Sequence, residues 1–508
     1  MSDPVPSPFR LRLPLLLLCV VGVALPCLGV KFPPITDLPQ HLGQVRLLLE
    51  ALHDPNSPYR IQPLTPYWGA HVVLLPLWLA LPLEWVGSAA VLALGMLWTA
   101  TVHVLAWRRG RSVDTAVLAT LFFFSQVLYW GFIPLLAGWP VYGAWLLIIQ
   151  APRISPRRGL LLFVGAALLY WFHALWFALG MLTLVLHWAR TRPGWRTVLL
   201  QGAAVVPVGV LALVWFSQLS QRGFTSRTAY LRDLGNRLSP SGFTAAALGG
   251  LRDSVEGPLV LLVVLWVALG LWQHRGALRR EVDGALLPPG LLMVALALAL
   301  PDIAQNTILM AERWMPFGLA LVVLALPTPR LPARALHAWS AALLLLLSGF
   351  TSLVWRTYEE QDLSGFEASL EATPEGSRVM GLDYLVSSSL VRGRPYLQLF
   401  AWSHVLLGAR NNFSFAWFAP NPVVFRKRRA PPWSWGVEWD TRMLKPERDF
   451  RHFDYLLVGL PEEMHAQFEA TMPVRAVTQQ GRWRLYRTAL PPAEPTRPAA
   501  TPDTAATP

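Results

Sequence analysis

An aspartate and a histidine lie one helical turn apart in the stretch TDLPQH (36–41), directly after an apolar N-terminal segment. Pro39 suits the first turn of a helix, so Asp37 is expected at a helix N-terminus. An acid there commonly caps the helix, because it accepts hydrogen bonds from free N–H groups and complements the helix dipole. The alternative is chemical. A carboxylate beside a membrane is costly unless it is used, and Asp37 could take a proton from an acceptor hydroxyl or hold a metal ion.

The neighbouring histidine and acids carry less information. No HExxH motif or paired-histidine spacing accompanies His41, which favours a hydrogen-bonded or surface histidine over a metal or substrate ligand. Glu50 and Asp54 are the other acids between residues 31 and 68, and they are the candidates for a second acid. Asp37 is therefore the candidate catalytic base, and the need for a divalent cation is left open.

A second charged group occurs in PDIAQNTILMAERWMPFG (301–318), where Glu312 and Arg313 precede an apolar run. The planar guanidinium fork suits phosphate, so Arg313 is a candidate phosphate ligand, with Asp302 or Glu312 orienting the phosphate or a sugar. The alternative, of equal weight, is an interfacial arginine that pairs with its neighbouring acid or reaches lipid headgroups.

Aromatic residues surround a further histidine, His173, in YWFHALW (170–176), where they could line a substrate cavity. Trp and Tyr also gather at membrane interfaces for purely physical reasons. That interfacial explanation is favoured for His173 and equally for Tyr129, Trp130 and Trp139. These four residues are candidates only for lining a substrate cavity.

The elements that must position these residues lie in lipid. Hydrophobic residues make up 54% of the 508-residue chain and charged residues 14%, whereas about a quarter of a soluble domain is charged. Cys19 and Cys27 both lie in the first apolar segment, where they form neither a disulfide framework nor a zinc site. The net charge of +13 comes almost wholly from arginine, and the placement of those arginines in alternate loops excludes nucleic-acid binding.

Eleven apolar runs are expected to cross the membrane. The first, residues 13–30, also resembles a signal peptide, but the proline of Ala24-Leu25-Pro26 does not suit cleavage, which favours an uncleaved span. The other runs are 86–107, 113–131, 138–152, 159–172, 174–189, 197–217, 258–273, 285–300, 314–327 and 335–354. The segment 68–83 is interrupted by prolines and is expected to be an interfacial or re-entrant helix.

Arginine clusters occupy every second loop between these runs, at 108–111, 153–158, 190–196, 275–280 and 330–334. The positive-inside rule makes these loops cytoplasmic. The N-terminus is then cytoplasmic, and the long loop 31–68, the loops 218–257 and 301–313, and the chain after 354 lie outside. The outer loop 218–257 departs from the rule, because it carries Arg222, Arg227, Arg232, Arg237 and Arg252.

The pattern changes after residue 354. SRVMGLDYLVSSS (377–389), FRHFDYLLVGLP (450–461) and QQGRWRLYR (479–487) read as strands and EEMHAQFEA (462–470) as a helix, which predicts a small α/β or α+β domain over 355–489. The aromatic- and proline-rich stretch 408–440 could lie over a membrane cavity or bind a glycan. No phosphate-binding glycine motif occurs, which argues against a soluble nucleotide-sugar enzyme. The Pro/Ala/Thr-rich tail 490–508 is expected to be disordered.

This layout resembles the GT-C integral-membrane glycosyltransferases, such as the protein mannosyltransferases and the bacterial aminoarabinose transferases. The resemblance covers about residues 10–350. It rests on the first span, the acid-bearing loop with TDLPQH, the apolar helix WGAHVVLLPLWLALPL (68–83), a span closed by WRRGRS (107–112), and the segment YWGFIPLLAGWPVYGAW (129–145).

The resemblance implies transfer of a hexose or pentose from a polyprenyl-phosphate donor, with inversion, to a lipid, glycan or protein acceptor. The reaction would take place at the outer face of a bacterial inner membrane, as part of cell-envelope assembly, with Asp37 as base. Many members have a second acid directly after the first, whereas Leu38 follows Asp37 here, so the source of a second acid stays open. Two other classes also stay open: a transporter or flippase of lipid-linked glycans, and a non-catalytic envelope assembly protein.

Overall fold

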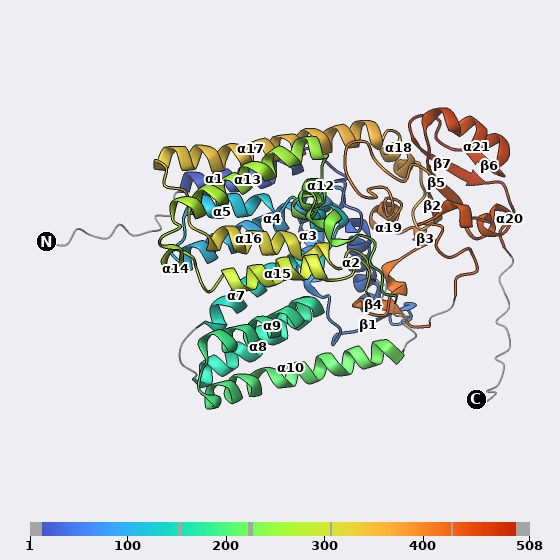
Figure 1. Cartoon of the computed structure of the whole chain (residues 1–508). Coiled ribbons are helices and arrows are strands. Elements are labelled where there is room, and N and C mark those ends of the chain that lie inside the picture. Colours follow the sequence, from blue (N-terminus) through green and yellow to red (C-terminus); the bar gives the residue numbers. More distant parts are fainter. Residues whose placement is uncertain (1–12, 151–154, 222–226, 305–306, 428–429, 494–508) are drawn as a thin grey trace. The chain divides into compact units, whose positions relative to one another are not determined.

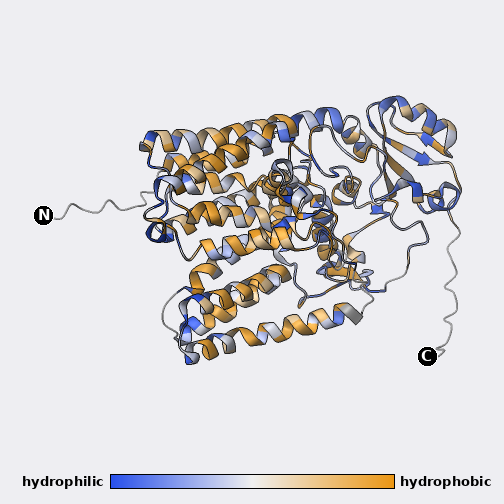
Figure 2. Ribbon diagram, viewed as in Figure 1, coloured by the Kyte–Doolittle hydropathy of each residue, from blue (hydrophilic) through white to orange (hydrophobic). Residues whose placement is uncertain are grey.

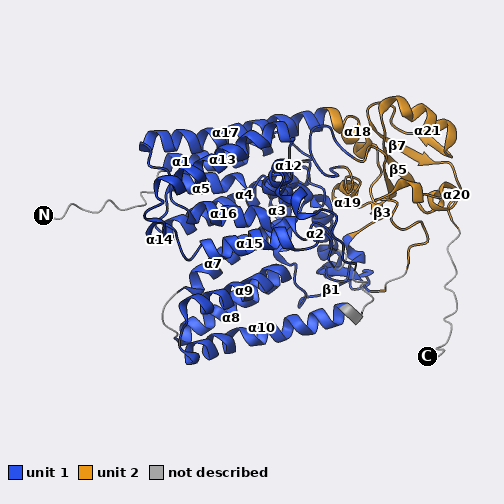
Figure 3. Cartoon of the chain, in the orientation of Figure 1, with its two compact units in different colours: residues 1–360, 387–395, 415–426 blue, residues 361–386, 396–414, 427–508 orange. Residues whose placement is uncertain are grey.

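The chain folds into two compact units, seen in a computed structural model (Figures 1 and 3). The structure describes residues 13–150, 155–221, 227–304, 307–427 and 430–493. The first unit comprises residues up to Glu360 together with 387–395 and 415–426, and the second comprises 361–386, 396–414 and the chain from 427. Two stretches of the C-terminal third therefore belong to the helical unit. From residue 494 onward the predicted disordered tail lies outside the described residues.

The first unit is a bundle of apolar helices, and Figure 2 shows hydrophobic residues along most of their length. Among the described residues, five helices are long and apolar enough to cross a membrane: α4 (Leu83–Arg108), α9 (Ala174–Thr191), α10 (Trp195–Gln221), α13 (Asp253–Gln273) and α17 (Ala333–Thr357). Beside them lie α1 (Leu13–Ala24), α7 (Ile133–Ile149), α8 (Pro156–Phe172), α15 (Leu287–Ala299) and α16 (Met315–Ala325). The prediction of an integral membrane protein with many helices is confirmed; the number of crossings stays a prediction.

One predicted run, 113–131, is not a single helix. It forms α5 (Val113–Leu121) and α6 (Gln126–Trp130), separated by a turn. The nine residues of α5 span about 14 Å, less than half of a bilayer core of roughly 30 Å. Tertiary contacts explain the break, because the Gln126 N–H donates to the Leu248 carbonyl instead of continuing α5.

Arginines tie several helices together at one end of the bundle. Arg109, at the C-terminus of α4, donates to both carboxylate oxygens of Asp283 (2.9 and 3.2 Å) and to Gln150 (2.9 Å). Arg111 donates to the carbonyls of Glu281, Leu324 and Leu326, which lie after α13 and at the end of α16. Two arginines of the predicted cluster 108–111 thus connect the end of α4 to the chain around α14 (Leu278–Glu281) and α16.

The opposite end of the bundle, where α4 begins, carries shorter elements. These are α2 (Leu38–His53), β1 (Tyr59–Ile61) and α3 (Gly69–Ala80). The 12 residues of α3 span about 18 Å, and the interfacial or re-entrant placement of this helix stays a prediction. Strand β4 (Val423–Phe425) runs antiparallel to β1.

The segment 415–426 covers one side of α2. The amides of Phe415 and Val423 donate to the side chains of Gln40 (3.2 Å) and Gln44 (3.3 Å). Ala416 and Val423 pack with two leucines of the same helix. Part of the aromatic-rich stretch 408–440 is therefore structural in the first unit, where it helps to hold the helix that follows Asp37.

The second unit is a small α/β domain, as predicted. Its sheet has the order β3-β2-β5-β7-β6, with β2 (Arg378–Asp383) parallel to β3 (Arg410–Asn411) and β5 (Tyr455–Gly459). Strand β7 (Trp483–Thr488) runs antiparallel to β5 and to β6 (Val474–Ala476). The helices are α18 (Phe366–Glu371), α19 (Ala401–Leu407), α20 (Pro446–Asp449) and α21 (His465–Thr471). Its core includes Met380, Leu456, Val458 and Tyr486.

Candidate active site at one end of the helical bundle

Asp37 occupies the position before α2, yet its side chain does not cap the helix. Its backbone is helical (φ −93°, ψ −2°), and no side-chain capping hydrogen bond forms. The backbone carbonyl of Asp37 accepts the His41 N–H at 3.1 Å. Among the described residues the Asp37 carboxylate has no hydrogen-bond or ion-pair partner. The carboxylate is therefore available to a ligand or substrate rather than committed to α2.

A tight turn after α6 holds the backbone of Asp37. The Thr36 and Asp37 N–H groups donate to the carbonyls of Tyr129 (3.0 Å) and Trp130 (3.1 Å). Gly131 follows with φ +85°, and a Cβ there would lie 2.8 Å from the Asp37 nitrogen. The segment YWG thus fixes the position of the candidate base, and it does so through backbone contacts that require glycine.

Substituting Gly131 by alanine should damage the site. Alanine would be strained in the left-handed conformation, and its Cβ would clash with Asp37. We therefore expect the free energy of unfolding to fall by about 1–3 kcal/mol, and the activity to fall because Asp37 is displaced. Gly29→Ala is the matched control, because Gly29 also has a positive φ (+77°) but a Cβ added there would meet no atom within 4 Å. Thermal unfolding of both purified variants checks this, and equal shifts for the two would contradict the role assigned to the turn.

Arg313 is a buried cation without a carboxylate partner in the described part of the chain. It lies in the short helix η2 (Glu312–Trp314) and is 7% exposed. Its guanidinium carbon lies 3.7 Å from the centre of the Phe132 ring. One nitrogen donates to the Ile308 carbonyl at 2.9 Å, whereas Nε has no partner among the described residues. A buried guanidinium with spare donors suits an anion such as a phosphate.

The charges of Asp37 and Arg313 act on one another. Burial raises the pKa of Asp37 to about 8, although part of the residue remains exposed, and the charge of Arg313 acts in the opposite direction. Burial lowers the pKa of Arg313 to about 10, against the effects of Tyr67 and Asp37, so the guanidinium stays charged at neutral pH. The pair combines a carboxylate that holds a proton well with a permanent cation.

Tyr67 is a residue that the sequence reasoning missed. Its backbone has φ +79°, which is rare for a bulky residue and is often kept at functional sites. Its ring lies edge-on to His173, with centroids 4.5 Å apart, and the charge of Arg313 acts on both side chains. Burial, helped by Arg313 and His41, holds the pKa of His173 well below its usual value, so this histidine is neutral.

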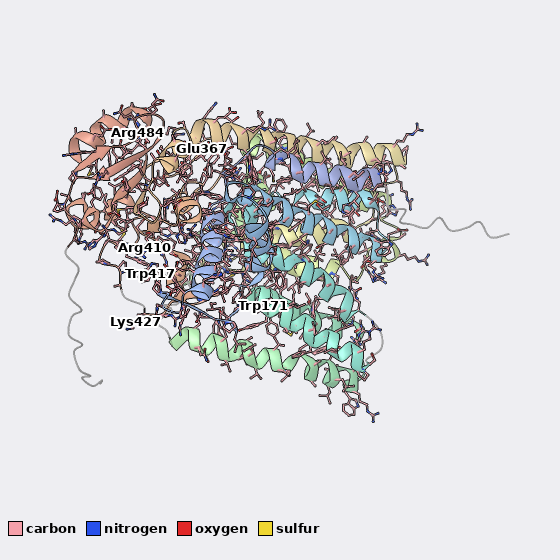
Figure 4. All side chains as sticks on the ribbon, turned by 180° about the vertical axis from the view of Figure 1, so that it is seen from behind. Trp171, Glu367, Arg410, Trp417, Lys427 and Arg484 are labelled. Atoms are coloured by element: carbon pink, nitrogen blue, oxygen red, sulfur yellow. The ribbon has the colours of Figure 1, made fainter. Side chains whose placement is uncertain are left out.

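The neighbour of Tyr67 anchors this conformation. The Trp68 N–H donates to the Trp171 carbonyl at 3.0 Å, and the two indoles stack with centroids 5.8 Å apart. Trp171, labelled in Figure 4, is near the C-terminus of α8. The proline before Tyr67 is a turn signal, but nothing in the composition of the stretch indicated that a tyrosine would adopt the left-handed conformation.

His41 lies close to the same group, on α2. Its ring contacts Phe415 edge-on at 5.2 Å. Burial, with a further contribution from the neighbouring His71, lowers the pKa of His41 to about 3, while the backbone of Gly131 acts in the opposite direction. The structure therefore brings Asp37, His41, His173 and Arg313 together, with both histidines neutral.

The two acids predicted to work with Arg313 have other partners. Asp302 is 2% exposed and accepts from Arg232 (2.7 Å) and Arg237 (2.8 Å), and Glu312 pairs with Arg232. Burial raises the pKa of Asp302, but hydrogen bonds from two backbone amides and these arginines outweigh it, so the pKa is lowered. Both acids thus belong to an ion-pair network that holds the loop before α11 (Leu234–Leu238).

The remaining candidates do not join the group. Glu50 and Asp54 lie at the far end of α2, about 20 Å or more from Asp37 by the helical rise, and accept from Ser57 (3.3 Å) and Asn56 (2.8 Å). Trp139 is fully buried in the bundle against Trp98, with ring centroids 5.2 Å apart. Tyr129 and Trp130 take part through their backbone carbonyls, as described above.

The described side chains near Asp37 do not by themselves form a metal site. No group of three or more His, Cys, Asp or Glu side chains that could hold a metal occurs in the part of the chain that the structure describes. The group near Asp37 contains one acid and a buried arginine whose positive charge opposes a second cation. The positive charge at this site comes from Arg313.

The fold and the site define a class: a polytopic helical membrane protein with a small α/β domain and a carboxylate–guanidinium group at one end of its bundle. No protein-family model matches the chain, and no curated protein matches it. Among solved structures it is similar to ArnT from Cupriavidus metallidurans bound to undecaprenyl phosphate, with a TM-score of 0.41, 12% identity, and coverage of 94% of this chain and 98% of that chain.

Proposed function

We propose that this chain is a membrane glycosyltransferase that moves a sugar from a polyprenyl-phosphate donor to an acceptor hydroxyl, with inversion at the sugar carbon. The observation that carries the proposal is the Asp37 carboxylate, which caps no helix and interacts electrostatically with Arg313. Arg313 is buried and has no carboxylate ion-pair partner among the described residues. An acid that can accept a proton and a cation that can bind a phosphate are the two groups this reaction requires.

The reaction would proceed in one displacement. Asp37 takes the proton of the acceptor hydroxyl while the oxygen of that hydroxyl forms a bond to the anomeric carbon of the sugar. The bond between that carbon and the phosphate oxygen breaks, and polyprenyl phosphate leaves with the electron pair. Arg313 stabilises the negative charge that develops on the leaving phosphate, as charge-assisted hydrogen bonds do in a site shielded from water.

Tyr67 and His173 would assist at the same phosphate or sugar. The Tyr67 hydroxyl has no hydrogen-bond partner among the described residues and can donate to a phosphate or sugar oxygen. His173 is neutral and brings no charge that would compete with Arg313. The proposed orientation places this end of the bundle on the outer face of a bacterial inner membrane, because the arginine clusters lie at the other end.

Activity should rise with pH through the pKa of Asp37. Only the ionised carboxylate can act as base, so kcat/KM is expected to increase about tenfold per pH unit on the acid side and to level off above about pH 8, the value to which burial raises the pKa of Asp37. Initial rates at constant ionic strength, measured over roughly four pH units centred on this value, give the profile. A profile that falls over this range would exclude a carboxylate base of this kind.

The composition of outer-face glycans and glycolipids tests the function itself. Cells that lack the protein should lose one sugar modification, and restoring the native chain should return it. The identity of the lost sugar would define the reaction. A cell that instead accumulates an unmodified lipid-linked glycan on the cytoplasmic face would indicate a flippase.

A further inference from the structure

A cationic pocket lies at the other end of the bundle, away from Asp37. It has a volume of about 530 Å³ and lies between the ends of α4, α7 and α8. Its walls include Arg108, Arg109, Arg157 and Arg158, and no acid lines it among the described residues. The link 151–154 is outside the described residues, and no part of the site is assigned to it.

Two of the four arginines are fixed by the protein and two have spare donors. Arg109 is held by Asp283 and Gln150, and Arg158 donates to the Ile148 carbonyl. Arg108 stacks on Trp107, with 5.1 Å between its guanidinium carbon and the ring centre, and has no ion-pair partner in the described chain. Arg157 is exposed and likewise unpaired among the described residues. The pocket therefore offers at least two unneutralised guanidinium groups.

The pocket continues into an apolar surface. Leu147, Ile148 and Leu161 also line it, beside the polar Gln150 and Ser155. From Leu161 an exposed apolar stripe follows α8 through Val164 and Leu168, which are 45%, 41% and 39% exposed and lie three and four residues apart on one face of the helix. A ligand that fills this site must combine an anionic head with apolar chains that run along a membrane-facing helix.

We propose that this pocket binds the phosphate headgroup of an anionic membrane phospholipid, with its acyl chains along the exposed face of α8. Basic pockets at the cytoplasmic ends of membrane helices are suited to such headgroups, because the anionic leaflet supplies the charge and the hydrocarbon supplies the chains. The bound lipid joins the ends of α4, α7 and α8, so it stabilises the folded chain. This site is independent of the proposed glycosyl transfer.

Thermal unfolding of the full chain in neutral detergent tests the proposal. Phosphatidylglycerol should raise the unfolding temperature, and phosphatidylcholine with the same acyl chains should not. The double variant Arg108→Gln/Arg157→Gln should bind the anionic lipid about 30-fold more weakly, since each basic residue near an anionic lipid contributes about fivefold. Inorganic phosphate, added alone, should stabilise little because it lacks the chains.

Arg196→Gln/Arg279→Gln is the matched control. Both residues are exposed, outside the pocket wall and in predicted arginine clusters, and Arg196 stacks on Trp195 as Arg108 stacks on Trp107. This control should keep the stabilisation by phosphatidylglycerol and the lipid phosphorus that co-purifies with the native chain. An equal loss of this stabilisation in both double variants would mean that the anionic lipid is attracted by the overall basic charge and not bound in the pocket. Equal stabilisation by inorganic phosphate would mean a small-anion site, and no preference for the anionic lipid would overturn the proposal.

Discussion

Asp37→Asn should abolish sugar transfer while leaving the protein folded. Removing a general base typically costs a factor of about 10²–10⁴ in rate, and among the described residues no second acid contributes to the pKa shift of Asp37. The readout is the outer-face glycan or glycolipid composition of cells that make the native chain or the variant at equal membrane abundance, supported by initial rates once donor and acceptor are known.

The stability of this variant provides an independent check. Burial raises the pKa of Asp37 from 3.8 to about 8, so the folded state holds the proton more tightly than the unfolded state. Native stability therefore falls as pH rises between these two values, and asparagine removes that loss. Asp37→Asn should unfold at the same temperature as the native chain or higher at neutral pH.

Asp54→Asn is the matched control for the loss of a carboxylate. Asp54 is exposed at the far end of α2, where it contacts the Asn56 N–H. We expect this variant to restore the sugar modification as fully as the native chain does. If Asp37→Asn also restored it fully, Asp37 would not be the base, and the transporter and assembly-protein hypotheses would move ahead.

Arg313→Gln should reduce transfer by about 10²–10³-fold, the usual cost of removing one donor that stabilises developing negative charge. Arg313→Lys keeps the charge but loses the planar fork and the contact over Phe132, so its activity should lie between those of the native chain and the glutamine variant. Binding of the donor phosphate should weaken in the same order, which a titration with polyprenyl phosphate would measure.

Arg237→Gln is the comparison that distinguishes a ligand-binding role of Arg313 from a structural role. Arg237 is similarly buried, but it donates to Asp302 and to the carbonyls of Ala297, Leu298 and Leu300. Breaking such a pair leaves a buried carboxylate short of a partner and costs about 3–5 kcal/mol. Arg313 has no carboxylate partner to abandon in the described chain, so Arg313→Gln should retain the native unfolding temperature. Equal destabilisation by both variants would argue that Arg313 is structural.

Much of the architecture is legible in the sequence because membrane burial is a local requirement. Each of the predicted apolar runs contains a helix, and the strands at 378–383, 455–459 and 483–488 overlap the stretches that read as strands. The exception, 113–131, is apolar throughout, and composition does not report where such a run bends. The bend exists because α6 pairs its backbone with residues 36, 37 and 248, which are distant in sequence.

In the candidate site, too, the residue types could be predicted from the sequence, whereas their contacts depend on distant segments. Asp37, His41, His173 and the arginine before α16 were each identifiable as candidates by residue type and by their place beside apolar runs. The partners were not. Asp302 and Glu312 lie close to Arg313 in sequence, but the arginines that neutralise them come from the loop before α11 and from α11 itself.

By itself, the sequence determined a polytopic helical membrane protein, a small C-terminal α/β or α+β domain, the separation of basic loops, and the residue types available for chemistry. Hydrophobic periodicity and charge placement act within one element, so a single chain displays them directly. Only the tertiary structure decided that the Asp37 side chain caps nothing, that Tyr67 adopts the left-handed conformation, and that Arg313 is buried without a carboxylate among the described residues. The physical reason is that each depends on contacts between segments far apart in sequence, whose geometry no local pattern records.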